Sequence, residues 1–234
     1  MNHPTVPNDC MTPLDQLLMN YAAGRLGDPE QLLVNAARAL NPDVRSRVAQ
    51  FEAMGAQLMC DQSPAEVNAD CLSLIMAKID ARPAPAAPCA DKTRPCGPAP
   101  ELNLPEIVHA LLAAVCAQQQ QWAPITKGVM RMELRLQPQP RTIVKKRLRL
   151  MKLAPRQSTP RHAHLGSEIT LVLHGAFTDE LGTFKRGDLI ILTDPRYAHQ
   201  PTAGEEGCVC LMLNEARLRF IDPIARAMNT FWRF

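Results

Sequence analysis

A proline-rich stretch between residues 82 and 105 constrains the fold of this chain more than any other sequence feature. It holds seven of the 21 prolines found in the 234 residues. Proline lacks a backbone N–H group and fixes its own φ angle, so a run of this kind forms neither a helix interior nor a central strand. We therefore predict an extended linker at 81–105, which separates a first domain at 1–80 from a second domain at 106–234.

The segment before this linker carries four sequence patterns that are typical of helix starts. In each, a short polar residue precedes a proline, and an acidic residue follows within the first turn. The polar side chain can accept hydrogen bonds from the first free amides, and proline is preset for the first helical position. The apolar residues that follow recur at helical spacing. We predict a small helical bundle over residues 12–80, with helices that begin at Thr12-Pro13, Asp28-Pro29, Asn41-Pro42 and Ser63-Pro64.

The segment after the linker changes from helical to strand-like patterns. One more helix is predicted at 105–121. From Gly128 onward the chain consists of short apolar or alternating runs that Gly, Pro and Asp interrupt about every ten residues. The expected fold class is therefore α+β with several domains, in which a C-terminal all-β barrel of the jelly-roll type follows the helical bundle and the linker. The basic residues of the 145–152 run are expected to form a solvated face.

Charge and composition exclude several classes of protein. The 26 Lys and Arg residues against 23 Asp and Glu residues give a formal net charge of +3, which is no argument for a direct nucleic-acid partner. The longest apolar stretch, at 107–117, is too short for a membrane span, and we expect a cytoplasmic protein without membrane contact. The eight cysteines are scattered without any C-x-x-C pair, so we expect reduced thiols and no disulfide framework. The first domain is close to the smallest size that holds its own core, so we expect it to complete its burial against a partner.

Three of the six histidines form one pattern that predicts a metal site. Residues i and i+2 of a strand face the same way, so His162 and His164 can present two imidazoles to one point. The turn at Gly166 can bring Glu168 back from the next strand, and His199 can complete the set from a third. Three imidazoles and one carboxylate suit a divalent metal. Zinc is the first expectation, and iron, manganese and nickel are alternatives.

The sequence around these histidines resembles a known family. The pattern H-x-H-x3-E-x6-G from His162 to a turn glycine, Gly175, is similar to the first cupin motif, and Gly187 through His199 is similar to the second. The resemblance is to the ChrR-type cupin anti-sigma factor family in particular, through the segments 153–155, 164–168, 172–180, 187–188 and 208–211. It implies a double-stranded β-helix barrel behind a helical domain that sequesters an extracytoplasmic-function sigma factor. Residues 17–26 resemble the first helix of that domain.

One departure from the family concerns the helical domain. The resemblance implies a zinc site there, formed by an N-terminal histidine and an H-x3-C-x2-C motif. The alignment places Ala37, Asn41 and Val44 at the last three of these positions, and no histidine stands near Thr12. We therefore expect no zinc in the N-terminal domain, and we expect capping by Asn41 and packing to hold the junction instead.

Cys208 and Cys210 have two interpretations. At i and i+2 of a strand they point the same way, and buried cysteines behave as small apolar residues of a core. The alternative is a pair near the metal that senses oxidation.

Two functions follow from the sequence. The first is a transcription regulator that sequesters an extracytoplasmic-function sigma factor through its helices, with the metallocupin as sensor of oxidative stress or of a small ligand. The second is a metal-dependent cupin enzyme of the dioxygenase type, whose N-terminal helices only form a homodimer. No nucleophile and base are recognisable outside the metal site, so no catalytic residue is assigned, and no partner-binding residue is identified.

Overall fold

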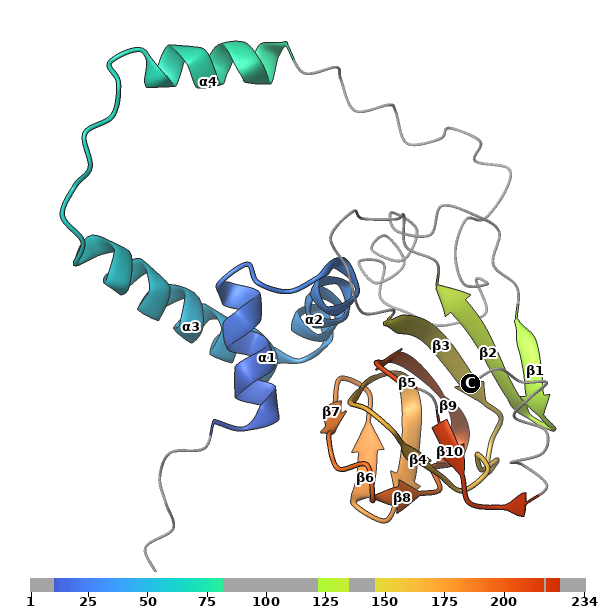
Figure 1. Cartoon of the computed structure of the whole chain (residues 1–234). Helices are drawn as coiled ribbons and strands as arrows, with labels where there is room; N and C mark the ends of the chain where they lie inside the picture. Colours follow the sequence, from blue (N-terminus) through green and yellow to red (C-terminus); the bar gives the residue numbers. More distant parts are fainter. Residues whose placement is uncertain (1–10, 82–121, 135–145, 217, 224–234) are drawn as a thin grey trace, which may run out of the picture.

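The computed structural model describes residues 11–81, 122–134, 146–216 and 218–223. The predicted linker, from residue 82 onward, and the predicted helix at 105–121 lie outside the described residues. The first part of the described chain is helical (Figure 1), and its helices are α1 (Pro13–Ala22), α2 (Asp28–Leu40), α3 (Pro42–Cys60) and α4 (Cys71–Asp80).

The first three predicted helix starts are confirmed. The Thr12 hydroxyl accepts a hydrogen bond from the Asp15 amide at 3.1 Å, and the Asn41 side-chain oxygen accepts one from the Asp43 amide at 2.9 Å. Both side chains satisfy amides that the helix itself leaves free. At the start of α2, however, the capping residue is Gly27, so Asp28 is the first helical residue and makes no side-chain cap.

The fourth predicted helix start is wrong. No helix begins at Ser63-Pro64, and α4 begins at Cys71. A local turn delays it: the Asn68 side-chain oxygen accepts from the Asp70 amide at 3.1 Å, and the Cys71 amide donates to the Asn68 carbonyl at 2.9 Å. Asparagine side chains compete with the helix for backbone donors in this way.

The second part of the described chain forms two antiparallel sheets that enclose a barrel. The larger sheet has the strand order β1-β2-β3-β9-β5-β6, with β7 also paired to β5, and the smaller has the order β10-β4-β8. The strands are β1 (Ala123–Thr126), β2 (Val129–Leu134), β3 (Arg147–Leu153), β4 (His162–His164), β5 (Glu168–Asp179), β6 (Gly182–Lys185), β7 (Leu189–Leu192), β8 (Ala198–His199), β9 (Thr202–Asn214) and β10 (Leu218–Phe220).

The long strands β3, β5 and β9 bury side chains on both faces. In register, Leu150 and Leu171 both pair with Leu211, and this row joins the apolar side chains of the helices in one core. The alternate residues, such as Met151 and Cys210, point into the barrel and form a second core. Because each buried leucine contributes about 1.5–3 kcal/mol, the outer face of this sheet requires a cover.

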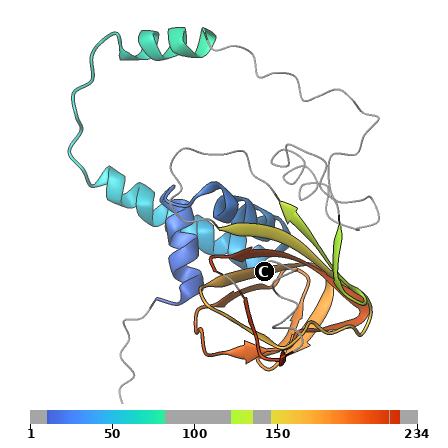
Figure 2. The ribbon, with the colours of Figure 1, turned by 45° about the vertical axis from the view of Figure 1, so that its right-hand side comes forward.

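Helices α1, α2 and the first half of α3 supply that cover (Figure 1), and the turned view shows them behind the large sheet (Figure 2). Two polar contacts fix their position. The Asn41 side-chain amide donates to the Gly187 carbonyl at 2.9 Å, and Lys146 pairs with both Glu30 of α2 and Glu215. The turn at Gly187 has φ +92°, and a side-chain carbon there would approach the Leu40 carbonyl oxygen to 3.2 Å. Glycine therefore permits the close approach of α2 to the barrel.

Helix α4 and the second half of α3 do not belong to this bundle, contrary to the prediction for residues 12–80. No residue of α4 is buried, and α3 buries only Val44 and Val48 near its start. In both views α4 stands apart from the other helices. Although α4 is apolar, none of the helices in the described ranges is long and apolar enough to cross a bilayer.

Two further sequence predictions need correction. Arg149, expected on a solvated face, is 2% exposed and lines the barrel interior, where its Nε donates to Glu133 at 2.7 Å. Gly175, expected in a turn, lies within β5, where the pairing with β9 is irregular. A side-chain carbon at Gly175 would come within 2.0 Å of the Gly207 carbonyl oxygen, so only glycine fits between the two strands.

Asn41 generates a stability prediction. Asn41→Ala should lower the free energy of unfolding by about 2 kcal/mol, because it removes a helix cap and a hydrogen bond to the barrel. Asn41→Asp keeps the capping oxygen but loses the donor to Gly187, so it should cost less. Chemical denaturation of the whole chain measures both values. Equal stability of wild type and Asn41→Ala would contradict this role.

Candidate metal centre

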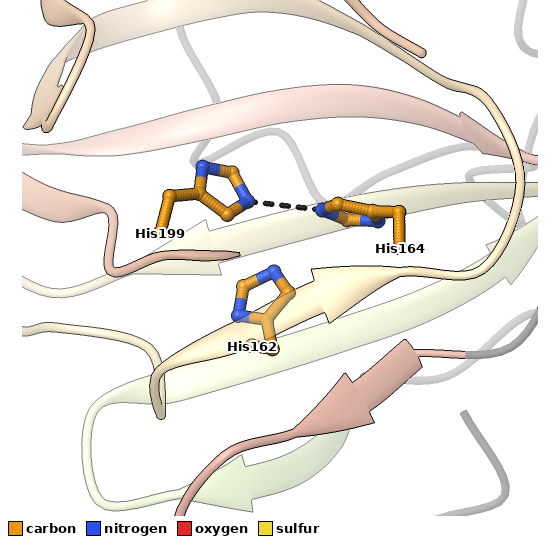
Figure 3. A group of neighbouring side chains, drawn as sticks. All are labelled: His162, His164 and His199. Atoms are coloured by element: carbon orange, nitrogen blue, oxygen red, sulfur yellow. Dashed lines mark hydrogen bonds between the residues drawn. The ribbon is translucent and has the colours of Figure 1, made fainter. Parts of the chain in front are cut away.

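Three buried histidines converge inside the barrel. His162 and His164 lie on β4, and His199 lies on β8 directly opposite His162 in the antiparallel register. One ring nitrogen from each lies within 4.8 Å of the others, as the close view of the three rings illustrates (Figure 3). The two-residue period of a strand thus brings the predicted pair His162 and His164 to one point, and strand pairing adds His199.

Hydrogen bonds fix the orientation of two of the rings. Nδ1 of His162 donates to the Pro160 carbonyl at 2.7 Å, and Nδ1 of His199 lies 2.8 Å from the Asp179 carboxylate. A ring that donates through Nδ1 carries its lone pair on Nε2. Nε2 of His199 faces Nε2 of His164 at 2.9 Å. Such support of the outer ring nitrogen is typical of histidines that bind a metal through the inner one.

Burial keeps the imidazoles of His162 and His164 neutral. Burial, together with the neighbouring His199 and His164 rings, lowers the pKa of His162 to about 3. Burial and the His199 ring likewise lower the pKa of His164 to about 3. A neutral imidazole is the form that binds metal, so at neutral pH both rings are ready to act as ligands.

Glu168 lies beside the histidines but has other partners. Its Oε2 is 3.1 Å from Nδ1 of His164, yet the same oxygen accepts from the Asn214 amide at 2.5 Å. Its Oε1 accepts from the Thr170 hydroxyl at 3.0 Å. Glu168 therefore borders the cluster of three histidines, and its oxygens are not among the atoms that lie within 4.8 Å of one another.

The side chains present fit a divalent metal ion. The three imidazoles offer inward nitrogens, and a buried carboxylate stands next to them. Such a mixed nitrogen and oxygen set is suited to a borderline divalent ion.

Three of the four predicted ligands, His162, Glu168 and His199, line a cavity of about 60 Å³. Most of the remaining wall is apolar: Ile125, Val129, Met151, Leu153, Phe177, Met212, Leu218 and Phe220. The cavity is large enough for a few water-sized groups next to the cluster.

Cys208 and Cys210 line the same cavity. Their sulfur atoms are 3.4 Å apart, and both side chains are buried. The contact with Cys208 and burial raise the pKa of the Cys210 thiol well above its ordinary value. Cys210 is therefore a protonated thiol at neutral pH, which is the less reactive form. The redox-sensing role of this pair stays a prediction.

Sequence reasoning missed the residues that support the ligands. Asp179 orients His199, and Asn214 and Thr170 hold Glu168. Asp179 and Thr170 follow the histidine motif on β5, but nothing in their spacing marks them. Asn214 meets Glu168 only through the pairing of β5 with β9, so the strand register was the missing information.

Comparisons with known proteins agree with this architecture. A family model described as ChrR Cupin-like domain matches residues 112–218. The anti-sigma-E factor ChrR of Cereibacter sphaeroides is 34% identical over 224 residues, which cover 94% of this chain and 96% of that protein. The fold and the histidine cluster thus define a cupin behind a helical domain. The chain belongs to the ChrR family of anti-sigma factors.

Two solved structures are among the matches. The crystal structure of Rhodobacter sphaeroides SigE in complex with the anti-sigma ChrR matches with a TM-score of 0.62 at 29% identity, over 86% of this chain and 96% of that one. An RmlC-like cupin protein from Ralstonia eutropha JMP134 matches with a TM-score of 0.39 at 17% identity, over 49% of this chain and 80% of that one.

Removal of one histidine tests the ligand assignment. His164→Ala should remove most of the bound metal, because its Nε2 faces His199 at the centre of the cluster. The barrel should stay folded, because the two apolar cores do not depend on this ring. Elemental analysis and circular dichroism of the purified variant check both statements. Unchanged metal content would show that the assignment is wrong.

The histidine cluster also predicts a pH dependence of stability once a chelator has removed metal. His162 and His164 have a pKa of 6.5 when unfolded and about 3 in the fold, so between these values the unfolded chain binds more protons. The free energy of unfolding should therefore fall as the pH falls below 6.5, by up to about 2 kcal/mol for each histidine at pH 5.

Denaturation curves at several pH values measure this slope. His162→Gln should show a shallower slope than wild type, because one of the two titrating groups is gone. His174→Gln is the matched control, because His174 lies on β5 outside the cluster. Parallel slopes for His162→Gln and wild type would contradict the prediction.

Proposed function

We propose that this protein is an anti-sigma factor, which binds an extracytoplasmic-function sigma factor through its helices and reads a signal through the metal centre of its cupin. The relative of known structure was solved in complex with SigE, and the matched region covers 86% of this chain. The proposed place of action is the cytoplasm. The domain limits 1–80, 81–105 and 106–234 are part of the same proposal.

The observation that carries this proposal is the exposed apolar surface of α3 and α4, which buries little against the other described helices and strands. Large apolar side chains on these helices are mostly exposed: Met54, Leu58, Met59, Leu72, Leu74, Ile75, Met76 and Ile79. Soluble proteins rarely expose so many neighbouring apolar groups unless a partner covers them. Ile75 and Ile79 lie one helical turn apart, the spacing by which an amphipathic helix binds a groove.

The metal centre is proposed to consist of His162, His164, Glu168 and His199, with zinc as the expected ion. When bound, a divalent ion supplies a Lewis-acidic centre next to the cavity. The chain itself orients the rings through Asp179 and the Pro160 carbonyl, and the apolar walls exclude bulk water. Cys208 and Cys210 face the same cavity, where an oxidant admitted to the metal would also meet two thiols.

The helical domain is proposed to act without zinc. Ala37 and Val44, which align with ligand positions of the family motif, are buried in the apolar core. Asn41, which aligns with the ligand position between these two, caps α3 and donates to the Gly187 carbonyl of the barrel. A cap and a hydrogen bond support the same helix junction, so sigma binding does not require a metal there.

Capture of a sigma factor tests the proposed function. The whole chain, purified from its native cell under reducing conditions, should carry an extracytoplasmic-function sigma factor. Ile75→Glu should then weaken binding of that sigma factor about 30-fold, because a charge replaces a central apolar contact worth about 2 kcal/mol.

The matched control is Ala77→Glu, which adds the same charge to the opposite side of α4. Both positions are exposed, so neither change should alter the fold of the free chain. Calorimetric titration of the purified sigma factor measures both affinities. Absence of any sigma factor from the native complex, or equal binding by the two variants, would contradict the proposed interface.

A further inference from the structure

A continuous chain of contacts links Glu168 to helix α2. The Asn214 amide donates to Glu168, and the next residue, Glu215, donates its backbone N–H to the Ser167 carbonyl at 3.1 Å. The Glu215 carboxylate binds the Lys146 ammonium at 2.7 Å, and the same ammonium binds Glu30 of α2. Two consecutive residues at the end of β9 thus contact both the metal-site carboxylate and the cation that anchors the helices.

The ends of this chain are buried, so its contacts are not interchangeable with water. Glu30 is 7% exposed and Glu168 is 2% exposed. Burial opposes the charge on Lys146, but its hydrogen bonds to Glu215 and Glu30 outweigh burial and raise its pKa above the ordinary value. A buried carboxylate such as Glu30 depends on its paired cation, so Lys146 is needed to hold α2 in place.

Glu168 can either keep its hydrogen bonds to Asn214 and Thr170 or bind a metal ion at the histidines. Both of its oxygens serve Asn214 and Thr170, while the adjacent histidines form a site that uses a carboxylate as its natural fourth ligand. An oxygen drawn toward the histidines loses hydrogen bonding to Asn214. A metal ion that binds a Glu168 oxygen therefore weakens the hydrogen bond from Asn214 at the end of β9. Two sites are coupled when a ligand of one changes the contacts of the other in this way.

We propose that metal binding at the histidine cluster and docking of α2 on the barrel are negatively coupled through Glu168, Asn214, Glu215 and Lys146. The inference rests on the proposed function and describes its regulation. Metal bound at the cluster loosens the Lys146 anchor of the helices, and loss of that anchor strengthens metal binding. Asn214 and Lys146 are positioning residues in this scheme, because they act through Glu168 and Glu30.

Zinc affinity of the whole chain tests the coupling. Lys146→Met removes the anchor and should bind zinc about fivefold more tightly than wild type, at the low end of common coupling strengths. Lys127→Met is the matched control, because Lys127 is exposed in the turn between β1 and β2. Competition with a chromophoric chelator measures the dissociation constants, and Glu30→Gln serves as a second variant should Lys146→Met fold poorly.

The reciprocal effect has its own readout. Zinc should speed hydrogen–deuterium exchange of the α2 amides in wild type and in Lys127→Met, and it should have little effect in Lys146→Met, where the anchor is already absent. Asn214→Ala should also tighten zinc binding. The double variant Asn214→Ala/Lys146→Met should then bind zinc no more tightly than Asn214→Ala alone, because both changes interrupt the same chain of contacts between Glu168 and α2.

The outcomes separate this inference from the proposed function. Equal zinc affinity of Lys146→Met, Glu30→Gln and Lys127→Met would overturn the coupling, while zinc binding and sigma capture would both stand. A wild-type chain that holds no zinc would overturn the proposed metal centre and the coupling with it. Loss of sigma capture by Ile75→Glu alone bears only on the helical interface.

Discussion

The long strands of the barrel can exist only if both of their faces are covered. In β3 the side chains of Leu148 and Leu150 point outward and alternate with Arg149 and Met151, which point inward. The barrel closes over the inner row, and the first three helices close over the outer row. Since each buried leucine is worth about 1.5–3 kcal/mol, this apolar contact holds the two parts together, while directional hydrogen bonds decide where the helices sit.

Local signals in the sequence predicted much of this architecture. A helix cap acts within three residues, so Thr12 and Asn41 marked α1 and α3 correctly, and the period of a strand placed His162 and His164 on one side. Contacts between distant parts of the chain could not be predicted from the sequence. The hydrogen bond from Asn41 to Gly187 joins residues 146 positions apart, and the inward direction of Arg149 follows from the pairing of its strand. Local signals also failed at some positions: α4 starts late because the Asn68 turn replaces the helix start expected at Ser63-Pro64, and Gly175 lies within β5 and not in a turn.

The histidine cluster illustrates how much of a site lies outside the residues that the sequence pattern names. The His162 ring is oriented by the Pro160 carbonyl and the His199 ring by Asp179, and neither of these residues belongs to the histidine pattern. Burial in the barrel core lowers the pKa of His162 and His164 and keeps these two rings neutral. The His-x-His motif therefore predicted that two imidazoles face one point, while the orientation of the rings is a property of the folded barrel.

The covered outer face of the sheet also affects how such a protein can change during evolution. A cupin that keeps its outer surface polar can be joined to any neighbour, but here Leu148, Leu150 and Leu211 contribute to a core that also contains residues of α1, α2 and α3. A gene rearrangement that replaced the helices would expose this row to water and favour self-association. Exchange of the cupin or of the helical domain therefore requires a matching change in the apolar row of the sheet.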